Sequence, residues 1–210
     1  MKNLLNRYPA LNVCAAEIEA ARDRLIQSFS ADGKLLLCGN GGSCADCDHI
    51  VGELMKGFLS LRPLEETQKN TMKQNCSSLT DEKLCRLQRA LPAISLPSMS
   101  ALSTAFCNDV SAEMVFAQGV LGLGRPQDIL LAISTSGNSK NVLRAAEVAK
   151  GLGICVISLT GGDGGALRAL SDVCICVSER ETYKVQELHL PIYHYLCAAI
   201  EAHFFRDSSV

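Results

Sequence analysis

Five short apolar runs, in which polar residues do not alternate with apolar ones, determine the fold class of this sequence. They occupy residues 34–38, 93–96, 128–133, 154–159 and 172–177. A run that stays apolar at successive positions is typical of a strand in a parallel sheet, because helices cover both faces of such a sheet. The sequence therefore predicts five parallel strands.

The segments between these runs show apolar residues at helical spacing. The helix-like segments are 11–29, 43–58, 100–108, 112–121, 139–150, 165–170 and 182–205. Strands that alternate with helices predict an α/β fold, here a three-layer αβα sandwich around a five-stranded parallel sheet. The length of 210 residues fits one domain, 1–210, of this kind.

One connection is unusually long for such a fold. Residues 64–91 join the second helix to the second strand, and the middle of this segment is polar. Thr80 followed by Asp81 and Glu82 is typical of a helix start. We expect an inserted helix or helical pair in this segment.

Charge and hydropathy exclude several classes of partner. The chain carries 22 acidic and 20 basic residues, and its net charge is −2. Proteins that bind nucleic acid or an anionic membrane surface usually carry a basic patch, so neither is expected as a partner. The apolar runs are far shorter than a membrane span, and the N-terminus lacks the apolar core of a signal peptide. We therefore expect a cytoplasmic protein.

Eleven cysteines are present, and without a secretion signal they are expected to be reduced. Most lie in apolar segments, where cysteine behaves as a small buried hydrophobic residue. Cys44 and Cys47 have the spacing of a redox or zinc site. A structural zinc site needs a second such pair, and the sequence shows none.

Three loops rich in glycine and hydroxyl side chains follow predicted strands. They are residues 38–43, 134–139 and 160–165. The second loop places Ser134, Thr135, Ser136 and Ser139 directly before a predicted helix. Hydroxyls and the free N–H groups of a helix N-terminus suit an anion, so a phosphate site is expected at this edge of the sheet.

Each loop taken alone is also compatible with ordinary turn and capping residues. Two such loops after strands of one sheet favour ligand binding. Nucleotides fit poorly, because the first loop has cysteine at position 44 where the dinucleotide motif has its third glycine. No Walker lysine follows either loop.

Titratable side chains point to chemistry beyond phosphate binding. His49 and Glu53 are four residues apart, which places them on one helix face. Gln186 and His194 are eight apart on the last predicted helix, about 80° around its axis. The alternative for His49 and Glu53 is a surface pair, but the apolar residues beside them argue for a largely buried helix.

Nine short segments, spread in order over nearly the whole chain, resemble the sugar isomerase (SIS) family. Within it they are most similar to the sedoheptulose 7-phosphate (phosphoheptose) isomerase branch. The segments are Gly39-Asn-Gly-Gly-Ser43, His49-x-x-x-Glu53-Leu54, Arg62-Pro63, Pro92-Ala93-Ile94, Asn108-Asp109, Gly124-Arg-x-x-Asp128, Ile133-Ser-Thr-Ser-Gly-Asn-Ser139, Leu159-Thr-Gly161 and Val185-Gln-Glu187-x-His189.

The resemblance implies roles for individual residues. The substrate-binding residues it implies are Asn40, Gly41, Gly42, Ser43, Asn108, Asp109, Ser134, Thr135, Ser136, Ser139 and Gln186. It implies zinc as a cofactor, held by His49, Glu53, Gln186 and His194. Glu53 and His194 match the acid–base pair of the family.

The function expected from the resemblance is aldose–ketose isomerisation of a phosphorylated sugar, with sedoheptulose 7-phosphate as the favoured substrate and a cis-enediol as the intermediate. The resemblance also implies a homotetramer with sites at subunit interfaces. A non-catalytic sugar-phosphate sensor or adapter is the alternative, as is an isomerase of another sugar phosphate. The intact set of four residues favours an enzyme.

Three features depart from the family pattern. They are the insertion at 64–91, the segment 181–184 before Gln186, and Pro191 between Gln186 and His194. A proline inside a helix removes one N–H group, so a kink between Gln186 and His194 is expected to alter their relative aim.

Overall fold

The computed structural model describes residues 1–205, and its centre is a five-stranded sheet in which all strands are parallel. In spatial order the strands are β2 (Ala93–Ser95), β1 (Leu35–Cys38), β3 (Ile129–Ile133), β4 (Cys155–Gly161) and β5 (Val173–Val177). The predicted five-stranded parallel sheet is confirmed. Each observed strand lies within two residues of its predicted bounds.

Both faces of the sheet are buried, which explains why the strand sequences do not alternate. All residues of β1 and β3 are buried. Leu35 and Leu37 point into one hydrophobic cluster, and Leu36, between them, points into the other. Burying one leucine side chain contributes about 1.5–3 kcal/mol, so these strands favour a central position in the sheet.

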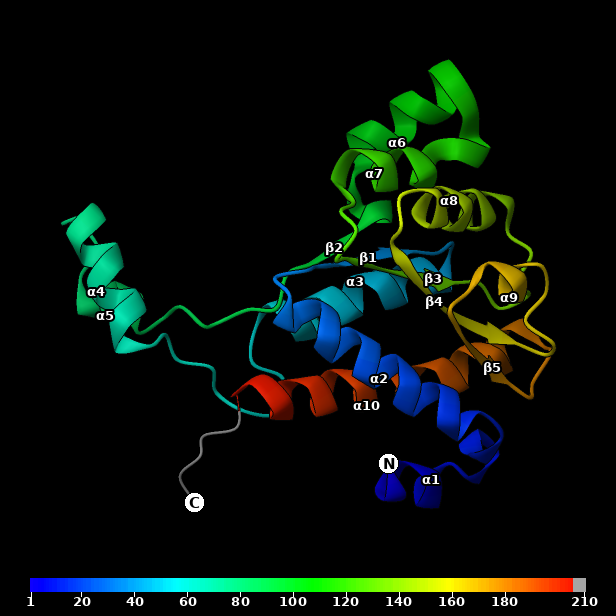
Figure 1. The fold of residues 1–210 in the computed structure, drawn as a ribbon, viewed down its shortest axis with the longest axis horizontal. Coiled ribbons are helices and arrows are strands. Elements are labelled where there is room, and N and C mark those ends of the chain that lie inside the picture. Colours follow the sequence, from blue (N-terminus) through cyan, green and yellow to red (C-terminus); the bar gives the residue numbers. More distant parts are fainter. Residues whose placement is uncertain (206–210) are drawn as a thin grey trace.

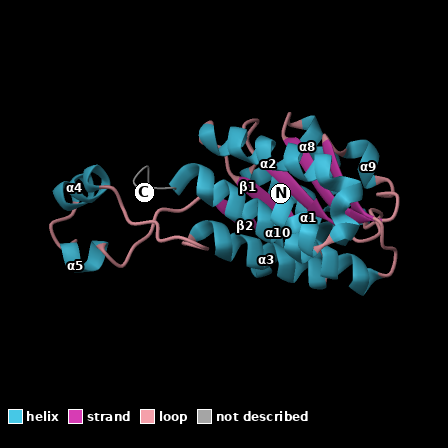
Figure 2. Ribbon diagram, turned by 90° about the horizontal axis from the view of Figure 1, so that it is seen from below, coloured by secondary structure: helices cyan, strands magenta, loops and turns pink. Residues whose placement is uncertain are grey.

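Helices form a layer on each side of the sheet (Figures 1 and 2). One layer contains α1 (Lys2–Arg7), α2 (Ala15–Ser30), α3 (Gly42–Met55) and α10 (Thr182–Phe205). The other contains α6 (Ser100–Phe106), α7 (Val115–Leu123), α8 (Lys140–Gly151) and α9 (Leu167–Leu170). The three-layer αβα sandwich is therefore confirmed.

Some helix bounds differ from those expected. The segment expected as one helix from residue 11 begins as a 3₁₀ helix, Pro9–Cys14, and becomes α-helical only at Ala15. A π-helical turn, Cys107–Ser111, and a 3₁₀ turn, Ala112–Met114, join α6 to α7. Another 3₁₀ turn, Leu96–Ser98, follows β2. These short turns lack the apolar periodicity from which longer helices are predicted.

The segment 64–91 contains two helices, α4 (Glu66–Asn75) and α5 (Asp81–Leu84), which stand away from the sandwich in Figures 1 and 2. A reciprocal capping box between Glu65 and Gln68 begins α4. This helix buries none of its residues, whereas α5 buries Leu84. The segment 64–91 is therefore held in shape by local capping and turns more than by a hydrophobic core.

The last helix, α10, runs without interruption through the buried Pro191. The proline expected to kink the helix between Gln186 and His194 therefore lies inside one continuous helix, and the effect of a kink on their relative aim stays a prediction. This helix packs against α2 and α3. Within residues 1–205, no helix combines the length and the apolar character needed to span a membrane.

His189 lies on α10 with none of its surface exposed. Its Nε2 atom is 3.3 Å from the carbonyl oxygen of Thr160, and its Nδ1 atom has no partner. Burial lowers the pKa of His189 to about 4, against an opposing contribution from the Thr160 carbonyl. The folded protein therefore keeps this imidazole neutral.

Because the folded pKa of His189 is lower than its unfolded value of about 6.5, the unfolded chain binds the extra proton first as pH falls. The contribution of neutral His189 to the free energy of unfolding is complete above pH 6.5, and it is lost as pH falls from 6.5 towards 4. Between pH 6.5 and 4, we expect the free energy of unfolding to fall by about 3 kcal/mol less in His189→Gln than in the wild type. Urea unfolding at a series of pH values measures this difference.

The matched control is His203→Gln, which changes an exposed histidine on the same helix. Its side chain lies in solvent, so this variant controls for the replacement of a histidine that is not buried. An unchanged slope in His189→Gln would contradict the assignment of this acid sensitivity to His189.

Candidate functional site

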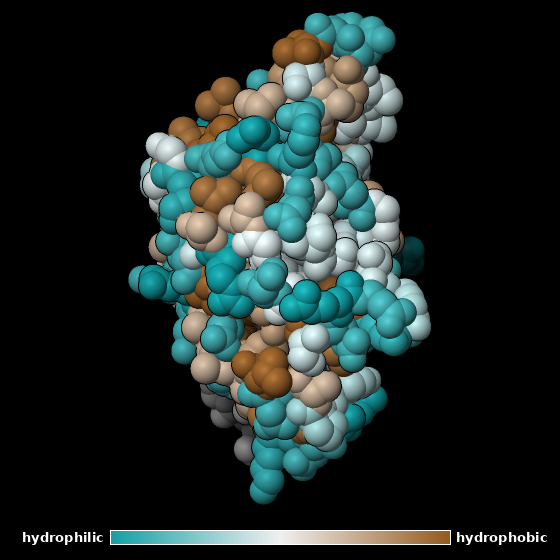
Figure 3. Space-filling view, turned by 90° about the vertical axis from the view of Figure 1, so that its right-hand side faces the viewer, coloured by the Kyte–Doolittle hydropathy of each residue, from teal (hydrophilic) through white to brown (hydrophobic). Residues whose placement is uncertain are grey.

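The three polar loops lie next to one another at the carboxyl edge of the sheet. The first follows β1, the second follows β3 and the third follows β4, and β3 pairs with both of its neighbours. Figure 3 looks onto the side of the molecule where α9 lies, and this face is largely hydrophilic or neutral, with scattered apolar residues. Parallel sheets bind ligands at this edge.

The serine-rich loop is internally ordered. The Ser134 hydroxyl, almost fully buried, donates to the Ser139 hydroxyl at 3.1 Å. Ser136 is exposed, and its Oγ accepts the backbone N–H of Asn138 at 3.2 Å. Ser139 directly precedes the twelve-residue helix α8, whose first N–H groups have no partner inside the helix.

The third loop holds the serine-rich loop in place. Gly137 has a φ of 65° and packs so closely on the carbonyl of Gly164 that a side chain has no room there. Its own carbonyl accepts the N–H of Leu167 at 3.0 Å. The Asn138 side chain accepts the N–H of Ala166, also at 3.0 Å. The hydroxyls are thus presented by a rigid turn.

The first loop is joined to the serine-rich loop through two asparagines. The side-chain amides of Asn40 and Asn141 exchange two hydrogen bonds, each 2.9 Å long. Gly41 and Gly42 are exposed, and Ser43, at the start of α3, is buried. The structure therefore brings Asn40 beside the helix that follows the serine-rich loop. The combined edge offers hydroxyls and helix N–H groups, which suit a phosphate dianion.

A second group of polar side chains lies further along α3, where this helix packs against α10. His49 Nε2 is 3.1 Å from Glu53 Oε1. The ring of His194 lies edge-on to that of His49, with centroids 5.0 Å apart. Lys56 Nζ is 3.2 Å from the other Glu53 oxygen. The structure thus places Glu53 and His194 around the shared neighbour His49.

His194 differs from the other residues of this group in its unpaired ring nitrogen. Its Nε2 atom is buried and has no hydrogen-bond partner. Burial lowers the pKa of His194, the nearby His49 lowers it further, and Glu53 opposes both effects. The ring of Phe58 covers it, with centroids 5.6 Å apart. A neutral imidazole with a free nitrogen is suited to exchange a proton with a ligand.

Two members of this group were not foreseen from the sequence. The Tyr193 hydroxyl lies 3.1 Å from His49 Nδ1 and donates to Asp46 Oδ1 at 3.2 Å. Burial raises the pKa of Asp46, and burial together with Asp46 raises that of Tyr193. The one sequence signal for Asp46 is its spacing of three residues from His49. Together these groups fix the orientation of the His49 ring.

Asn108 and Asp109 lie apart from the second group, and Gln186 lies beside the first polar loop. Asn108 and Asp109 are exposed on the π-helical turn, where the Asn108 amide donates to Asp109 at 2.8 Å. The Gln186 side chain packs against Gly42, at the beginning of α3. Gly42 and Glu53 are eleven residues apart, which is about 16 Å along the helix axis. Within one chain, the polar loops and the group of Glu53, His49 and His194 therefore lie at separate places.

The four residues predicted to hold zinc are His49, Glu53, Gln186 and His194, and His49 and Glu53 are in contact. In the described part of the chain, no three side chains from His, Cys, Asp and Glu are placed to hold one ion. His49 and Glu53 offer two donors 3.1 Å apart, and His194 offers a free buried nitrogen. Cys47 is buried with its pKa raised by burial, so it is suited to the core more than to metal binding.

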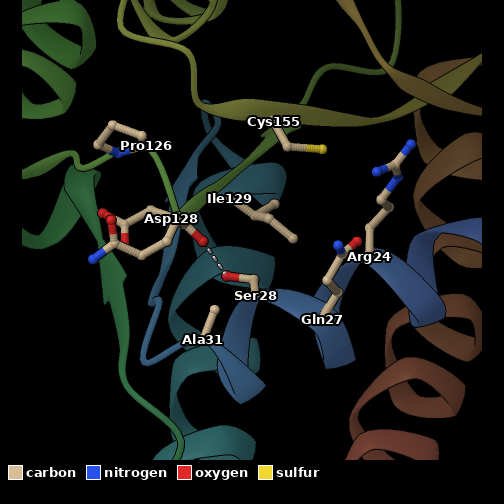
Figure 4. Close-up of a pocket in the computed structure, with 9 residues that line it drawn as sticks. Arg24, Gln27, Ser28, Ala31, Pro126, Asp128, Ile129 and Cys155 are labelled. Carbon is tan, nitrogen blue, oxygen red and sulfur yellow. Dashed lines mark hydrogen bonds between the residues drawn. The ribbon is translucent and has the colours of Figure 1, made fainter.

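The hollow drawn in Figure 4 is a different feature. It has a volume of about 210 Å³ and is lined by Arg24, Ser28 and Asp128, among others. It lies where β3 and β4 begin, at the opposite edge of the sheet from the loops. Its position therefore separates it from the candidate site.

Comparisons with known proteins identify the family of the chain. Residues 101–199 match the SIS domain. A phosphoheptose isomerase from Helicobacter pylori is 41% identical over 180 residues, covering 86% of this chain and 80% of the relative. One from Synechocystis is 37% identical over 197 residues, covering 94% and 88%.

Solved structures give the same assignment. The phosphoheptose isomerase from Neisseria gonorrhoeae has a TM-score of 0.75 and 32% identity, covering 93% of this chain and 91% of that one. The enzyme from Francisella tularensis has a TM-score of 0.76 and 32% identity, covering 92% and 90%. Sequence identity and fold agree, and the chain belongs to the phosphoheptose isomerase family.

Proposed function

We propose that this protein is an aldose–ketose isomerase that converts sedoheptulose 7-phosphate to a heptose 7-phosphate. Relatives named phosphoheptose isomerase that align over most of both chains support this function. The main supporting observation is that Glu53 from α3 and His194 from α10 both lie beside His49. A sensor or adapter has no need of an acid–base pair.

The reaction moves two hydrogens between neighbouring carbon and oxygen atoms. Glu53 takes a proton from C1 of the ketose, while His194 gives a proton to the carbonyl oxygen on C2, which yields a cis-enediol. The C1 hydroxyl then loses its proton to His194, and Glu53 returns a proton to C2. A carboxylate paired with a neutral imidazole suits this sequence near neutral pH.

Substrate binding is assigned to the loop edge. The phosphate is held by Ser134, Thr135, Ser136 and Ser139 together with the N-terminus of α8. The facing turn contributes Asn40, Gly41, Gly42 and Ser43, whereas Asn108, Asp109 and Gln186 complete the sugar-binding set. The hydrogen-bonded contact between Asn40 and Asn141 supports a shared role for the two loops.

We also propose zinc as a cofactor, held by His49, Glu53, Gln186 and His194. The unpartnered Nε2 of His194 and the short separation of His49 and Glu53 support it. Gln186 lies nearer the start of α3, so its part in the set requires movement or a second subunit. Bound zinc supplies a Lewis acid that polarises sugar oxygens.

A cytoplasmic homotetramer with sites at subunit interfaces is the proposed assembly. The distance along α3 between the phosphate loops and Glu53 supports it, because a second copy can bring a phosphate loop close to Glu53. Exposed apolar residues occur on α10 and on the 3₁₀ turn before α2, with Leu190 41% exposed and Val13 64%. Such residues are suited to burial between subunits.

The phosphate assignment predicts the effect of removing two hydroxyls. Ser136→Ala combined with Ser139→Ala weakens binding of the sugar phosphate by about 1–3 kcal/mol in isothermal calorimetry, since charge-assisted donors are lost. The control pair is Ser28→Ala with Ser171→Ala, which removes two hydroxyls that bond elsewhere, to the carbonyls of Gln127 and Leu167. Equal affinity in both double variants would contradict the phosphate site.

The acid–base assignment predicts large losses in turnover. Glu53→Gln and His194→Gln each lower kcat by about 10²–10⁴-fold while sugar-phosphate affinity stays within a few-fold, because each removes a proton carrier and leaves the phosphate loops intact. Glu147→Gln, at an exposed site on α8, is the control for loss of a carboxylate.

Zinc content is measured in the same samples. Loss of turnover with zinc retained assigns the two residues to proton transfer, whereas loss of both assigns them to metal binding. Wild-type rates in both variants, or a wild type that turns over no phosphorylated sugar, would remove the enzyme proposal in favour of a sensor or adapter.

The assembly prediction is tested by light scattering. At micromolar concentration we expect a mass near four times 22.5 kDa, because the split site within one chain is completed by neighbours. A monomeric mass at this concentration would contradict the proposed shared sites.

A further inference from the structure

A buried carboxylate on α10 binds the segment that follows α3. Glu201 is 2% exposed. Its carboxylate accepts the N–H groups of Phe58 and Leu59, each at 2.7 Å, and that of Ser60 at 3.1 Å. Burial alone raises the pKa of Glu201, but these N–H groups and Arg62 outweigh burial and hold the pKa below its usual value. The carboxylate thus remains ionised inside the protein.

A buried arginine completes this arrangement and ends α3. Arg62 has no exposed surface, and its Nε donates to Glu201 at 2.8 Å. Its two terminal nitrogens donate to the carbonyls of Leu54 at 2.7 Å and Glu53 at 3.1 Å. These carbonyls lie in the last turn of α3, where helix carbonyls have no partner within the helix. Its guanidinium also stacks over Phe205, 4.5 Å from the ring centroid.

This ion pair acts on both members of the acid–base pair through separate contacts. Arg62 holds the backbone of Glu53 directly. Glu201 holds the backbone of Phe58, whose ring covers His194. Breaking a buried ion pair leaves an uncompensated charge, so the segment between the two helices must rearrange when either partner is lost.

We propose that Arg62 and Glu201 are positioning residues for catalysis, which lock the end of α3 onto α10 and so fix Glu53 relative to His194. The inference rests on the proposed isomerase function. It adds a role for two residues that touch neither phosphate nor sugar. A positioning role also explains why a charged pair is buried beside Glu53 and His194, since an apolar pair of similar volume is often equally stabilising.

The test uses full-length Glu201→Gln, which keeps the shape of the side chain but removes the charge and presents an amide NH₂ to donors. We expect kcat for sedoheptulose 7-phosphate to fall at least tenfold, while KM and the affinity for inorganic phosphate change less than threefold. A structural defect spread over the fold would change binding and turnover together.

A second variant covers the case in which Glu201→Gln fails to fold. Arg62→Lys keeps a cation beside Glu201 but loses the pair of bonds to the Glu53 and Leu54 carbonyls. If the arginine positions Glu53 through these bonds, kcat again falls tenfold or more in folded protein. A kcat within twofold of the wild type would overturn the proposal.

The matched control is Asp128→Asn, which replaces another buried carboxylate with a neutral amide. Asp128 bonds Lys34 Nζ at 2.6 Å and the N–H of Arg125 at 2.7 Å, at the opposite edge of the sheet. We expect this variant to lower the melting temperature with kcat unchanged at temperatures where it is folded. An equal loss of kcat in Asp128→Asn would assign the effect of Glu201→Gln to general destabilisation.

A spectroscopic measurement separates this inference from the isomerase proposal. Proton NMR signals of the His194 ring, assigned with His194→Gln, shift in Glu201→Gln because the covering Phe58 ring moves, and they stay in place in Asp128→Asn. Unmoved His194 signals in folded Glu201→Gln would overturn the positioning role. If the wild type lacks turnover but these signals shift, the isomerase proposal fails and the positioning of His194 stands.

Discussion

Burial of both faces of the parallel sheet decides where polar groups lie in this molecule. Strands β1 and β3 are apolar at every position, so their buried side chains offer no polar groups to a ligand. Because all strands run in one direction, every loop that leaves a strand for a helix emerges at one edge. Hydroxyls, glycines and helix N–H groups therefore gather there, and the N-terminus of α8 adds a favourable field for an anion.

The packing of α3 against α10 supplies the second requirement of an isomerase. The two helices run side by side in the same direction, since Gly42 lies by Gln186 and His49 by His194. Groups from distant parts of the sequence thereby meet in a partly buried place, where burial lowers the pKa of His194. The segment after α3 is tied to α10 by Glu201, so this geometry depends on the full length of both helices.

The sequence predicts the sheet well because burial on both faces leaves a direct trace in the apolar runs. The last helix was placed with the observed bounds, since its apolar residues repeat throughout residues 182–205. The start of α2 and the end of α3 were misplaced. Pro9 begins a 3₁₀ turn, and Arg62, which lies beyond the end of the helix, takes the carbonyls of Glu53 and Leu54 in the last turn of α3. The apolar periodicity of the sequence does not report such contacts.

The candidate site shows the same division. Hydroxyls directly after a buried strand could be recognised from residue types and order. Tyr193 and Asp46 could not, because their contact with His49 depends on how α3 and α10 are rotated against each other. The assignment of Gln186 and His194 to one metal site comes from family resemblance, whereas the structure packs Gln186 against Gly42 within one chain.

In the proposed reaction Glu53 and His194 move protons between neighbouring atoms of the substrate through an enediol, and the proton held by Glu53 exchanges with solvent before it returns to C2. The most direct measurement is the conversion of sedoheptulose 7-phosphate in D₂O by the purified protein, with product analysed by proton NMR. The account predicts deuterium at C2 of the product aldose, formed by the wild type and lost with turnover in Glu53→Gln. Product that retains only substrate hydrogen at C2, as in a direct hydride shift, would contradict it, as would the absence of any product.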